Sequence, residues 1–349
     1  MQLSDPAGEG ERILTICNAC RYCEGYCAVF PAMERRLTFS AADLNYLANL
    51  CHNCGECFYA CPYAPPHDFA VNVPKTLAEI RVRSYENCSW PAPFRAGFRH
   101  SAGIAGAALA LSAAAAWFAP AGSDFYEVIP HGWMVALSGA AGLLAILACG
   151  LGVRRLWRTL APLPYQHGAL RQAFSDALTM RYLGSGGAGC PYPGEPHSQA
   201  RRWFHHCTFY GFMLCLASTS IAAFYDSVLG LRAPYPYFSL PVVLGTLGGL
   251  GLLAGPFGLY RLMRQRDPAT DEPGERRLSS GFLWMLLLTS LTGLALLGLR
   301  QTAAMPALLV LHLGIVMALF LSMPYGKFVH GLYRFAALIR YAMEQANKR

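Results

Sequence analysis

The chain has 349 residues, of which 54% are hydrophobic and only 14% are charged. An ordinary soluble domain has about 25% charged residues, so this composition excludes a disordered protein and indicates a membrane protein. Residues 1–98 contain 8 Lys/Arg and 10 Asp/Glu, whereas residues 99–349 contain 20 Lys/Arg and 10 Asp/Glu. A basic excess that is confined to the apolar part of the chain indicates cationic membrane loops. We therefore expect no nucleic-acid partner.

Two cysteine runs near the N-terminus have the spacing C-x2-C-x2-C-x3-C, which is typical of proteins with two [4Fe–4S] clusters. The runs are Cys17-Asn-Ala-Cys20-Arg-Tyr-Cys23-Glu-Gly-Tyr-Cys27 and Cys51-His-Asn-Cys54-Gly-Glu-Cys57-Phe-Tyr-Ala-Cys61-Pro62. In this pattern the fourth cysteine of each run binds the neighbouring cluster. The sequence therefore predicts cluster I on Cys17, Cys20, Cys23 and Cys61, and cluster II on Cys51, Cys54, Cys57 and Cys27.

Zinc is the alternative interpretation of clustered cysteines. The first 15 residues lack an apolar core, so we expect no secretory signal and a reducing compartment, where thiols bind metals rather than form disulfides. Zinc sites use two pairs of ligands, whereas each run here is a ladder of four cysteines. The spacing therefore favours iron–sulfur clusters over zinc.

The segment between the two runs is predicted to be a short helix over residues 40–50. Ser40 is its N-cap, and Asp43 stands at the third helical position. A helical spacer of this size is typical of the all-helical ferredoxins in respiratory iron–sulfur subunits. We therefore interpret residues 1–98 as a cytoplasmic, helical, ferredoxin-like domain.

Six later segments carry no Asp, Glu, Lys or Arg and are long enough to span a bilayer, which needs about 20 apolar residues. They are residues 101–120, 131–153, 203–224, 234–260, 278–299 and 301–325. We expect an all-α protein, with a six-helix transmembrane bundle in residues 99–335 and a basic cytoplasmic tail in residues 336–349. Glycines at 245, 248, 249 and 251 lie inside a span and are interpreted as helix-packing positions.

The distribution of Lys and Arg predicts the orientation of the spans. The loops 154–202 and 261–277 and the C-terminal tail are rich in these residues, whereas the opposite loops contain only Arg232 and Arg300. Basic loops stay on the cytoplasmic side. We therefore expect both termini in the cytoplasm and a multi-pass protein of the bacterial inner membrane.

Histidines at membrane depth are candidate haem ligands, because ionisable residues are rare there. A b-type haem needs two imidazoles that face each other from neighbouring helices. His205 or His206 opposite His330 is the first candidate pair, and His312 with His131 is a second. His312 and His330 are 18 residues apart, which would place them on one face of a continuous helix. Interfacial histidines without a cofactor are the alternative.

Two further motifs complete the pattern. The third span begins with Arg201-Arg-Trp-Phe-His205-His206-Cys-Thr-Phe-Tyr210-Gly211-Phe212, and the last ends with His312 followed by Pro324-Tyr-Gly-Lys327-Phe-Val-His330-Gly. With these motifs and with paired cysteine runs before six spans, the chain resembles the tricarballylate-utilisation protein B family. This family is also called citrate-utilisation protein B. It is related to the C-terminal half of the flavohaem protein CobZ.

The resemblance implies a membrane electron-transfer protein without a substrate-level catalytic site of its own. Its expected partner is a separate FAD-dependent tricarballylate dehydrogenase, which converts tricarballylate to cis-aconitate. Electrons would pass through two [4Fe–4S] clusters and haem b to the membrane quinone pool. The last span also resembles the haem-binding helix of nitrate reductase gamma subunits.

Two other classes of function stay open. The chain could be the iron–sulfur and cytochrome b subunit of another respiratory oxidoreductase, similar to nitrate reductase gamma or heterodisulfide reductase. It could also be an iron–sulfur redox sensor or a transporter, which predicts neither haem nor quinone reduction.

Overall fold

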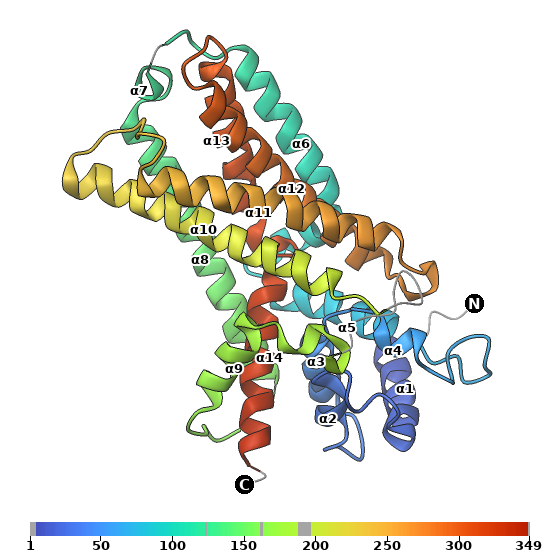
Figure 1. The fold of residues 1–349 in the computed structure, drawn as a ribbon. Helices are drawn as coiled ribbons and strands as arrows, with labels where there is room; N and C mark the ends of the chain where they lie inside the picture. Colours follow the sequence, from blue (N-terminus) through green and yellow to red (C-terminus); the bar gives the residue numbers. More distant parts are fainter. Residues whose placement is uncertain (1–4, 123, 161–162, 188–196, 348–349) are drawn as a thin grey trace.

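The computed structural model describes residues 5–122, 124–160, 163–187 and 197–347, whose regular elements are α-helices and short 3₁₀ helices. This confirms the predicted all-α class. Figure 1 shows two regions: the N-terminal helices gather at the lower end together with the C-terminal helix, and the long apolar helices lie mostly above them, some of them running obliquely across the view.

The N-terminal region consists of five helices that share one apolar core. They are α1 (Pro6–Cys20), α2 (Val29–Met33), α3 (Ala41–Leu50), α4 (Glu56–Tyr59) and α5 (Val73–Cys88). Helix α3 is the predicted helix between the cysteine runs. Its capping box is present, because the Ser40 side chain accepts a hydrogen bond from the Asp43 backbone N–H and the Asp43 carboxylate accepts one from the Ser40 backbone.

The six predicted spans are all present as helices that are long and apolar enough to cross a membrane. They are α6 (Gly97–Trp117), α8 (His131–Thr159), α10 (Ala200–Leu229), α11 (Leu240–Arg264), α12 (Pro273–Leu299) and α13 (Met305–Ser322). Two short helices precede or join them, η1 (Ala92–Ala96) and α7 (Phe125–Val128). Helix α12 begins before the charge-free segment, so Glu275 lies in its first turn and is buried.

The last apolar helix does not continue through His330. Helix α13 ends at Ser322, the 3₁₀ helix η5 (Met323–Tyr325) follows, and Gly326 is extended before α14 (Val329–Ala346) begins. Pro324 cannot donate the backbone hydrogen bond that a continuous helix requires. The prediction that His312 and His330 share one face of a single helix is therefore wrong.

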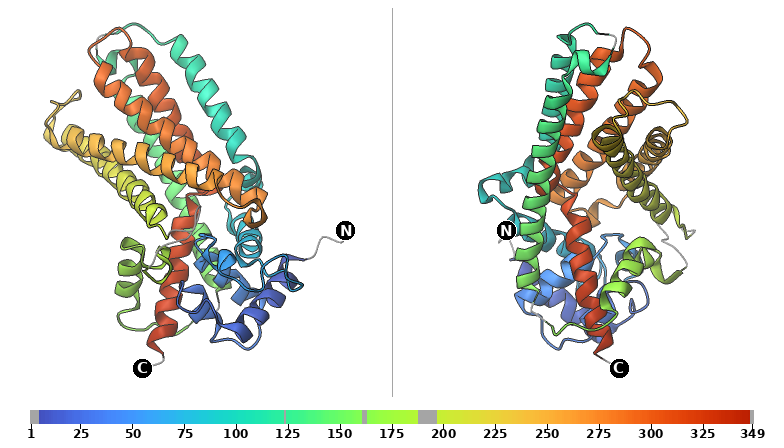
Figure 2. Two further views of the ribbon diagram at one scale, coloured as in Figure 1. Left: turned by 45° about the vertical axis from the view of Figure 1, so that its right-hand side comes forward. Right: turned by 90° about the vertical axis from the view of Figure 1, so that its left-hand side faces the viewer.

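Helix α14 runs beside the N-terminal helices, as the views in Figure 2 show. The boundary expected at residue 335 lies within this helix, and most of its described residues beyond that boundary are buried. Glu344 pairs with Arg36 and accepts a hydrogen bond from the Tyr46 hydroxyl at 3.1 Å. Arg340 lies over the Tyr46 ring at 4.5 Å. The C-terminal helix is thus part of the core of the N-terminal region.

The long loop before the third span contains α9 (Ala169–Leu178), which packs on the same helix α14. The rings of Phe174 and Phe335 are 4.7 Å apart, and the Tyr182 hydroxyl donates to Asp176 at 3.2 Å. Three more 3₁₀ turns lie in connecting segments: η2 (Arg181–Leu183), η3 (Ser185–Gly187) and η4 (Pro268–Thr270). This part of the loop therefore covers α14 from the side.

Glycines allow α10 and α11 to approach closely, as predicted for the glycine-rich span. A Cβ at Gly248 would lie 2.8 Å from the backbone nitrogen of Cys215 and the carbonyl oxygen of Gly211. Small residues at helix contacts are the usual means of close backbone packing in membranes. Because these two neighbours are backbone atoms, a side chain at position 248 could be accommodated only if the two helices moved apart.

We expect Gly248→Ala to destabilise the α10–α11 contact by about 1–3 kcal/mol, the usual cost of overpacking. Thermal unfolding of the detergent-solubilised protein measures the loss. Gly142→Ala in α8 is the matched control, because a Cβ there meets nothing within 4 Å. Equal melting temperatures for the two variants would show that α10 and α11 do not meet in this way.

Candidate iron–sulfur sites

The first cysteine run begins on a helix and ends in a turn. Cys17 and Cys20 lie in the last turn of α1, which ends where Arg21 adopts a left-handed conformation with φ 55° and its N–H bonds the Cys17 carbonyl. The chain then reverses through a turn that carries Cys23, and Cys27 precedes α2. This reversal directs the first three cysteines toward a common space.

The second run is arranged around two left-handed positions. Asn53 has φ 54° and Gly55 has φ 90°, a region that asparagine and glycine tolerate better than other residues. The Asn53 backbone N–H lies 3.2 Å from the Cys51 sulfur. The loop therefore curls around the position where the sulfurs of Cys51 and Cys54 lie.

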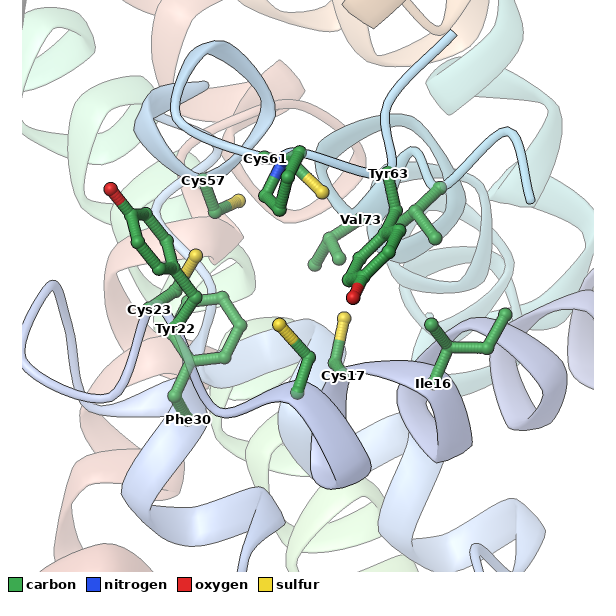
Figure 3. A pocket seen from close by; sticks show the side chains of 12 residues that line it. Ile16, Cys17, Tyr22, Cys23, Phe30, Cys57, Cys61, Tyr63 and Val73 are labelled. Carbon is green, nitrogen blue, oxygen red and sulfur yellow. The ribbon is translucent and has the colours of Figure 1, made fainter. Parts of the chain in front are cut away.

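Two cavities open between the runs, and their volumes include space that is open to solvent. The first, of about 370 Å³, is lined by Cys17, Cys20, Cys23 and Cys61 together with Cys57. Figure 3 shows several of these sulfurs directed into the cavity, with aromatic side chains around it.

The second cavity, of about 410 Å³, is lined by Cys27, Cys51, Cys54 and Cys57. We call the two four-cysteine sets the cluster I site (Cys17, Cys20, Cys23 and Cys61) and the cluster II site (Cys27, Cys51, Cys54 and Cys57). The fold thus brings together the sets that the crossed spacing predicts.

The donor sets fit iron–sulfur clusters. Each site offers four thiols, the ligand set of a [4Fe–4S] cluster. Among the residues that the structure describes, no three Cys, His, Asp or Glu side chains converge closely enough to hold one metal ion. The assignment of each cysteine to a cluster stays a prediction.

Burial controls the protonation of these thiols before metal is bound. Burial, followed by the proximity of the other cysteines, raises the pKa of Cys17 to about 12, and burial raises that of Cys23 to about 12. Cys17 and Cys23 therefore remain neutral near pH 7 without metal. Metal binding needs thiolates, so cluster assembly must release these protons.

A histidine of the second run lies at the junction with the apolar helices. The ring of His52 lies 5.8 Å from that of His205 on α10 and 6.0 Å from that of His330 on α14. Burial, with the nearby Arg334 cation as a second cause, lowers the pKa of His52 well below its usual range. His52 is therefore a neutral imidazole between the cluster II loop and two long helices.

Arginine side chains hold the cluster II loop to its surroundings. Arg81 on α5 donates to the carbonyls of Ala48 and Cys51 at 3.1 and 2.9 Å, and it pairs with Glu275 of α12 at 3.0 Å. Lys327 contacts the same carboxylate. The loop is thus connected through a buried charge network to helix α12 and to the segment before α14.

The four predicted haem histidines do not form one site. His205 and His330 share His52 as a neighbour, and His330 Nδ1 lies 3.2 Å from the Tyr85 hydroxyl. His206 instead stacks on Tyr210, with ring centres 5.7 Å apart.

The second candidate pair is separated as well. His312 contacts the Thr292 hydroxyl at 3.0 Å on α12. His131 pairs with Asp226 at 2.8 Å. No contact joins these two histidines among the described residues.

Sequence reasoning missed His52, Arg81 and Glu275. His52 stands between two cluster cysteines rather than in an apolar segment, so a search for histidines at membrane depth overlooks it. Glu275 lies just before the charge-free segment that marks the fifth span. A charged residue in the first turn of an apolar helix, such as Glu275, is the sequence signal that could have predicted the buried charge network.

Comparison with known proteins identifies the family. Residues 100–349 match the family described as "Citrate utilization protein B", and residues 10–87 match its Fer4-like domain. The chain belongs to the citrate utilization protein B family. The family match confirms the resemblance drawn from the cysteine runs and the histidine motifs, and it assigns an iron–sulfur, Fer4-like domain to the N-terminal region.

A curated member of the family is similar over nearly the whole chain. The Escherichia coli protein named "Citrate utilization protein B" is 47% identical to this chain. The alignment is 355 positions long, and it covers 98% of this chain and 94% of that protein. No solved structure matches the chain.

Proposed function

We propose that this protein is a membrane electron-transfer protein that reoxidises a soluble, flavin-dependent dehydrogenase of tricarballylate or citrate utilisation and delivers the electrons to membrane quinone. One observation carries the proposal: the two cavities lined by the cluster cysteines lie side by side, and the second is in contact with the apolar helix α10 and with α14 through His52. The family name and the related Escherichia coli protein support the link to citrate utilisation.

The eight cysteines of the two sites would hold two [4Fe–4S] clusters, which supply one-electron redox chemistry when bound. The protein's own contribution is to place the two sites next to each other, since Cys57 lines both cavities. The charge network of Arg81 and Glu275 keeps the second site fixed against the membrane helices.

The positions of the predicted haem ligands show whether a haem would fit between His205 and His330. The His52 ring contacts both His205 and His330, so it occupies the room that a porphyrin between these two would need. The described residues therefore do not fit a haem in this position. Haem stays a prediction from the resemblance, and no step is derived through it.

Quinone is the proposed acceptor because a buried polar layer lies where the two regions meet. Quinone reduction takes two electrons and two protons. Tyr85 and His330 are hydrogen-bonded at 3.2 Å, and Lys327 contacts the buried Glu275. Tyr85, His330 and Lys327 would donate hydrogen bonds to the quinone carbonyls and pass protons to them close to the cluster II site, while the Glu275 carboxylate would hold Lys327 in place.

The donor would bind at the opposite side, on the cytoplasmic face of the N-terminal region. Cys20 of the cluster I site is exposed, and the neighbouring Tyr22 is 62% exposed. The basic loops between the spans support an inner-membrane protein with both termini in the cytoplasm. A soluble dehydrogenase would then reach cluster I without crossing the membrane.

Anaerobic purification in detergent, with quantitation of iron, acid-labile sulfide and haem, tests the cofactors. We expect about eight irons and eight sulfides per chain. The reduced protein should be reoxidised by a water-soluble quinone analogue. Zinc without sulfide would contradict the proposal, as would clusters that quinone does not oxidise.

The partner is tested separately with a purified flavin dehydrogenase of the same source organism. We expect tricarballylate, added with the dehydrogenase, to bleach the cluster absorption of this protein. Tricarballylate should not do so without the dehydrogenase. Bleaching by NADH alone would instead favour another respiratory complex.

A further inference from the structure

The two cluster sites differ in their surroundings. The cluster I site is at the outer surface, where Cys20 is exposed. The cluster II site contains the buried Cys51 and lies against α10 and α14 through His52. The outer site is therefore open to a soluble donor, and the inner site is adjacent to the membrane helices.

Two buried cations approach only the inner site. Arg334 of α14, 6% exposed, donates to the carbonyl of Leu50, directly before Cys51. Arg266, just after α11 and 9% exposed, donates to the Asn53 side chain at 2.9 Å, directly before Cys54. By contrast, Arg21 beside Cys20 is exposed, so water screens its charge.

These two arginines have neutral acceptors. Among the ion pairs of the described residues, neither Arg266 nor Arg334 has a carboxylate partner, whereas Arg81 is paired with Glu275. Buried charges are normally paired because their desolvation is costly. Arg334 faces Cys51, Cys27 and Cys54 of the cluster II site, and Arg266 faces Cys54 as well as the nearby carboxylate of Asp271.

Backbone hydrogen bonds do not distinguish the two sites. Cys61 of the cluster I site accepts from the N–H groups of Tyr63 and Ala64. At the cluster II site, Cys51 accepts from Asn53 and Cys27 from Val29. The reduction potential of a cluster depends on net charge, on hydrogen bonds to sulfur and on exposure. Charge and exposure are therefore the two features that separate the sites.

We propose that Arg266 and Arg334 give cluster II the higher reduction potential, so that electrons enter at cluster I and leave from cluster II toward α10 and α14. This inference rests on the proposed function. Each transfer oxidises the centre at the cluster I site by one electron and reduces the centre at the cluster II site by one electron. No bond forms or breaks, and no proton moves in this step.

The physical reason is that the reduced form of a cluster carries one more negative charge. Nearby buried cations stabilise this form more than the oxidised form, because the interior screens the interaction weakly. Burial alone acts in the opposite direction, since it disfavours the extra charge. The two buried cations outweigh this penalty at the cluster II site, where one buried carboxylate, that of Glu56, also lines the cavity.

An anaerobic redox titration followed by EPR tests the order of the two potentials. Cys20→Ser identifies the cluster I signal, because only the cluster with the altered ligand changes its spectrum. We expect the unaltered signal to have the higher midpoint potential in the wild type. A wild-type protein in which the cluster I signal has the higher potential would overturn the proposal.

Arg266→Gln tests the cause. We expect the equilibrium constant for electron transfer from cluster I to cluster II to fall about tenfold, which corresponds to about 59 mV for one electron, with the cluster I potential unchanged. Arg264→Gln is the matched control, since Arg264 is exposed and two residues away. Arg266→Lys, which keeps the charge, should restore most of the potential.

The outcomes separate this inference from the proposed function. Unchanged potentials in Arg266→Gln and in Arg334→Gln would overturn the role of the arginines while leaving the electron-transfer function intact. Absence of iron and sulfide from the wild type would instead overturn the function itself. If Arg266→Gln fails to assemble cluster II, the wild-type order and Arg266→Lys still decide the question.

Discussion

Replacing Cys61 by alanine is expected to remove cluster I, although Cys61 belongs to the second cysteine run. Its side chain lines the cavity of Cys17, Cys20 and Cys23. The iron content should fall from about eight to about four per chain. EPR of the dithionite-reduced protein should then show one signal in place of two interacting signals.

Four variants distinguish crossed from sequential ligation. Crossed ligation requires that Cys20→Ala and Cys61→Ala lose the same EPR signal and that Cys27→Ala and Cys54→Ala lose the other. Sequential ligation would instead group Cys61→Ala with Cys54→Ala. Cys88→Ala is the control, because Cys88 is buried in the same region but lines neither cavity.

Replacing Arg81 by methionine is expected to cost about 3–5 kcal/mol, the range for breaking a buried ion pair. Arg81 is fully buried and connects three groups: the carbonyls of Ala48 and Cys51 and the carboxylate of Glu275. Methionine fills similar space but leaves all three acceptors without this donor. Cluster II, whose loop begins at Cys51, should be lost first.

Chemical unfolding in detergent and the cluster II EPR signal measure this effect. Arg83→Met is the matched control, because Arg83 is on the same helix but its side chain is 61% exposed. Arg81→Lys should give an intermediate loss, since one ammonium does not reproduce the planar fork of a guanidinium. A fully stable Arg81→Met protein with two intact clusters would show that the network does not support the site.

The parts of the fold that depend on local patterns were predictable from the sequence. The six apolar helices follow from length and composition, the helix α3 follows from Ser40 and Asp43, and the tight α10–α11 contact follows from the spacing of glycines such as Gly248. In each case the residues that define the feature are close in the chain.

The parts that depend on distant residues were not predictable. His52 meets His205 and His330, which are more than 150 residues away, and a single sequence contains no signal for such pairing. Basic residues such as Arg340 predict a solvated cytoplasmic tail, yet Arg340 and the neighbouring Arg334 are both buried in the structure. Because these residues are charged, the sequence does not show that this face of α14 packs against the N-terminal helices.

The position of α14 has a consequence for biosynthesis. The N-terminal helices are translated before the six apolar helices, but Glu344 and its neighbours, which complete the core of the N-terminal region, are translated after them. At roughly 5–20 residues per second, many seconds pass between the synthesis of the N-terminal helices and the synthesis of α14. We therefore expect the iron–sulfur region to reach its native packing only after α14 has emerged from the ribosome.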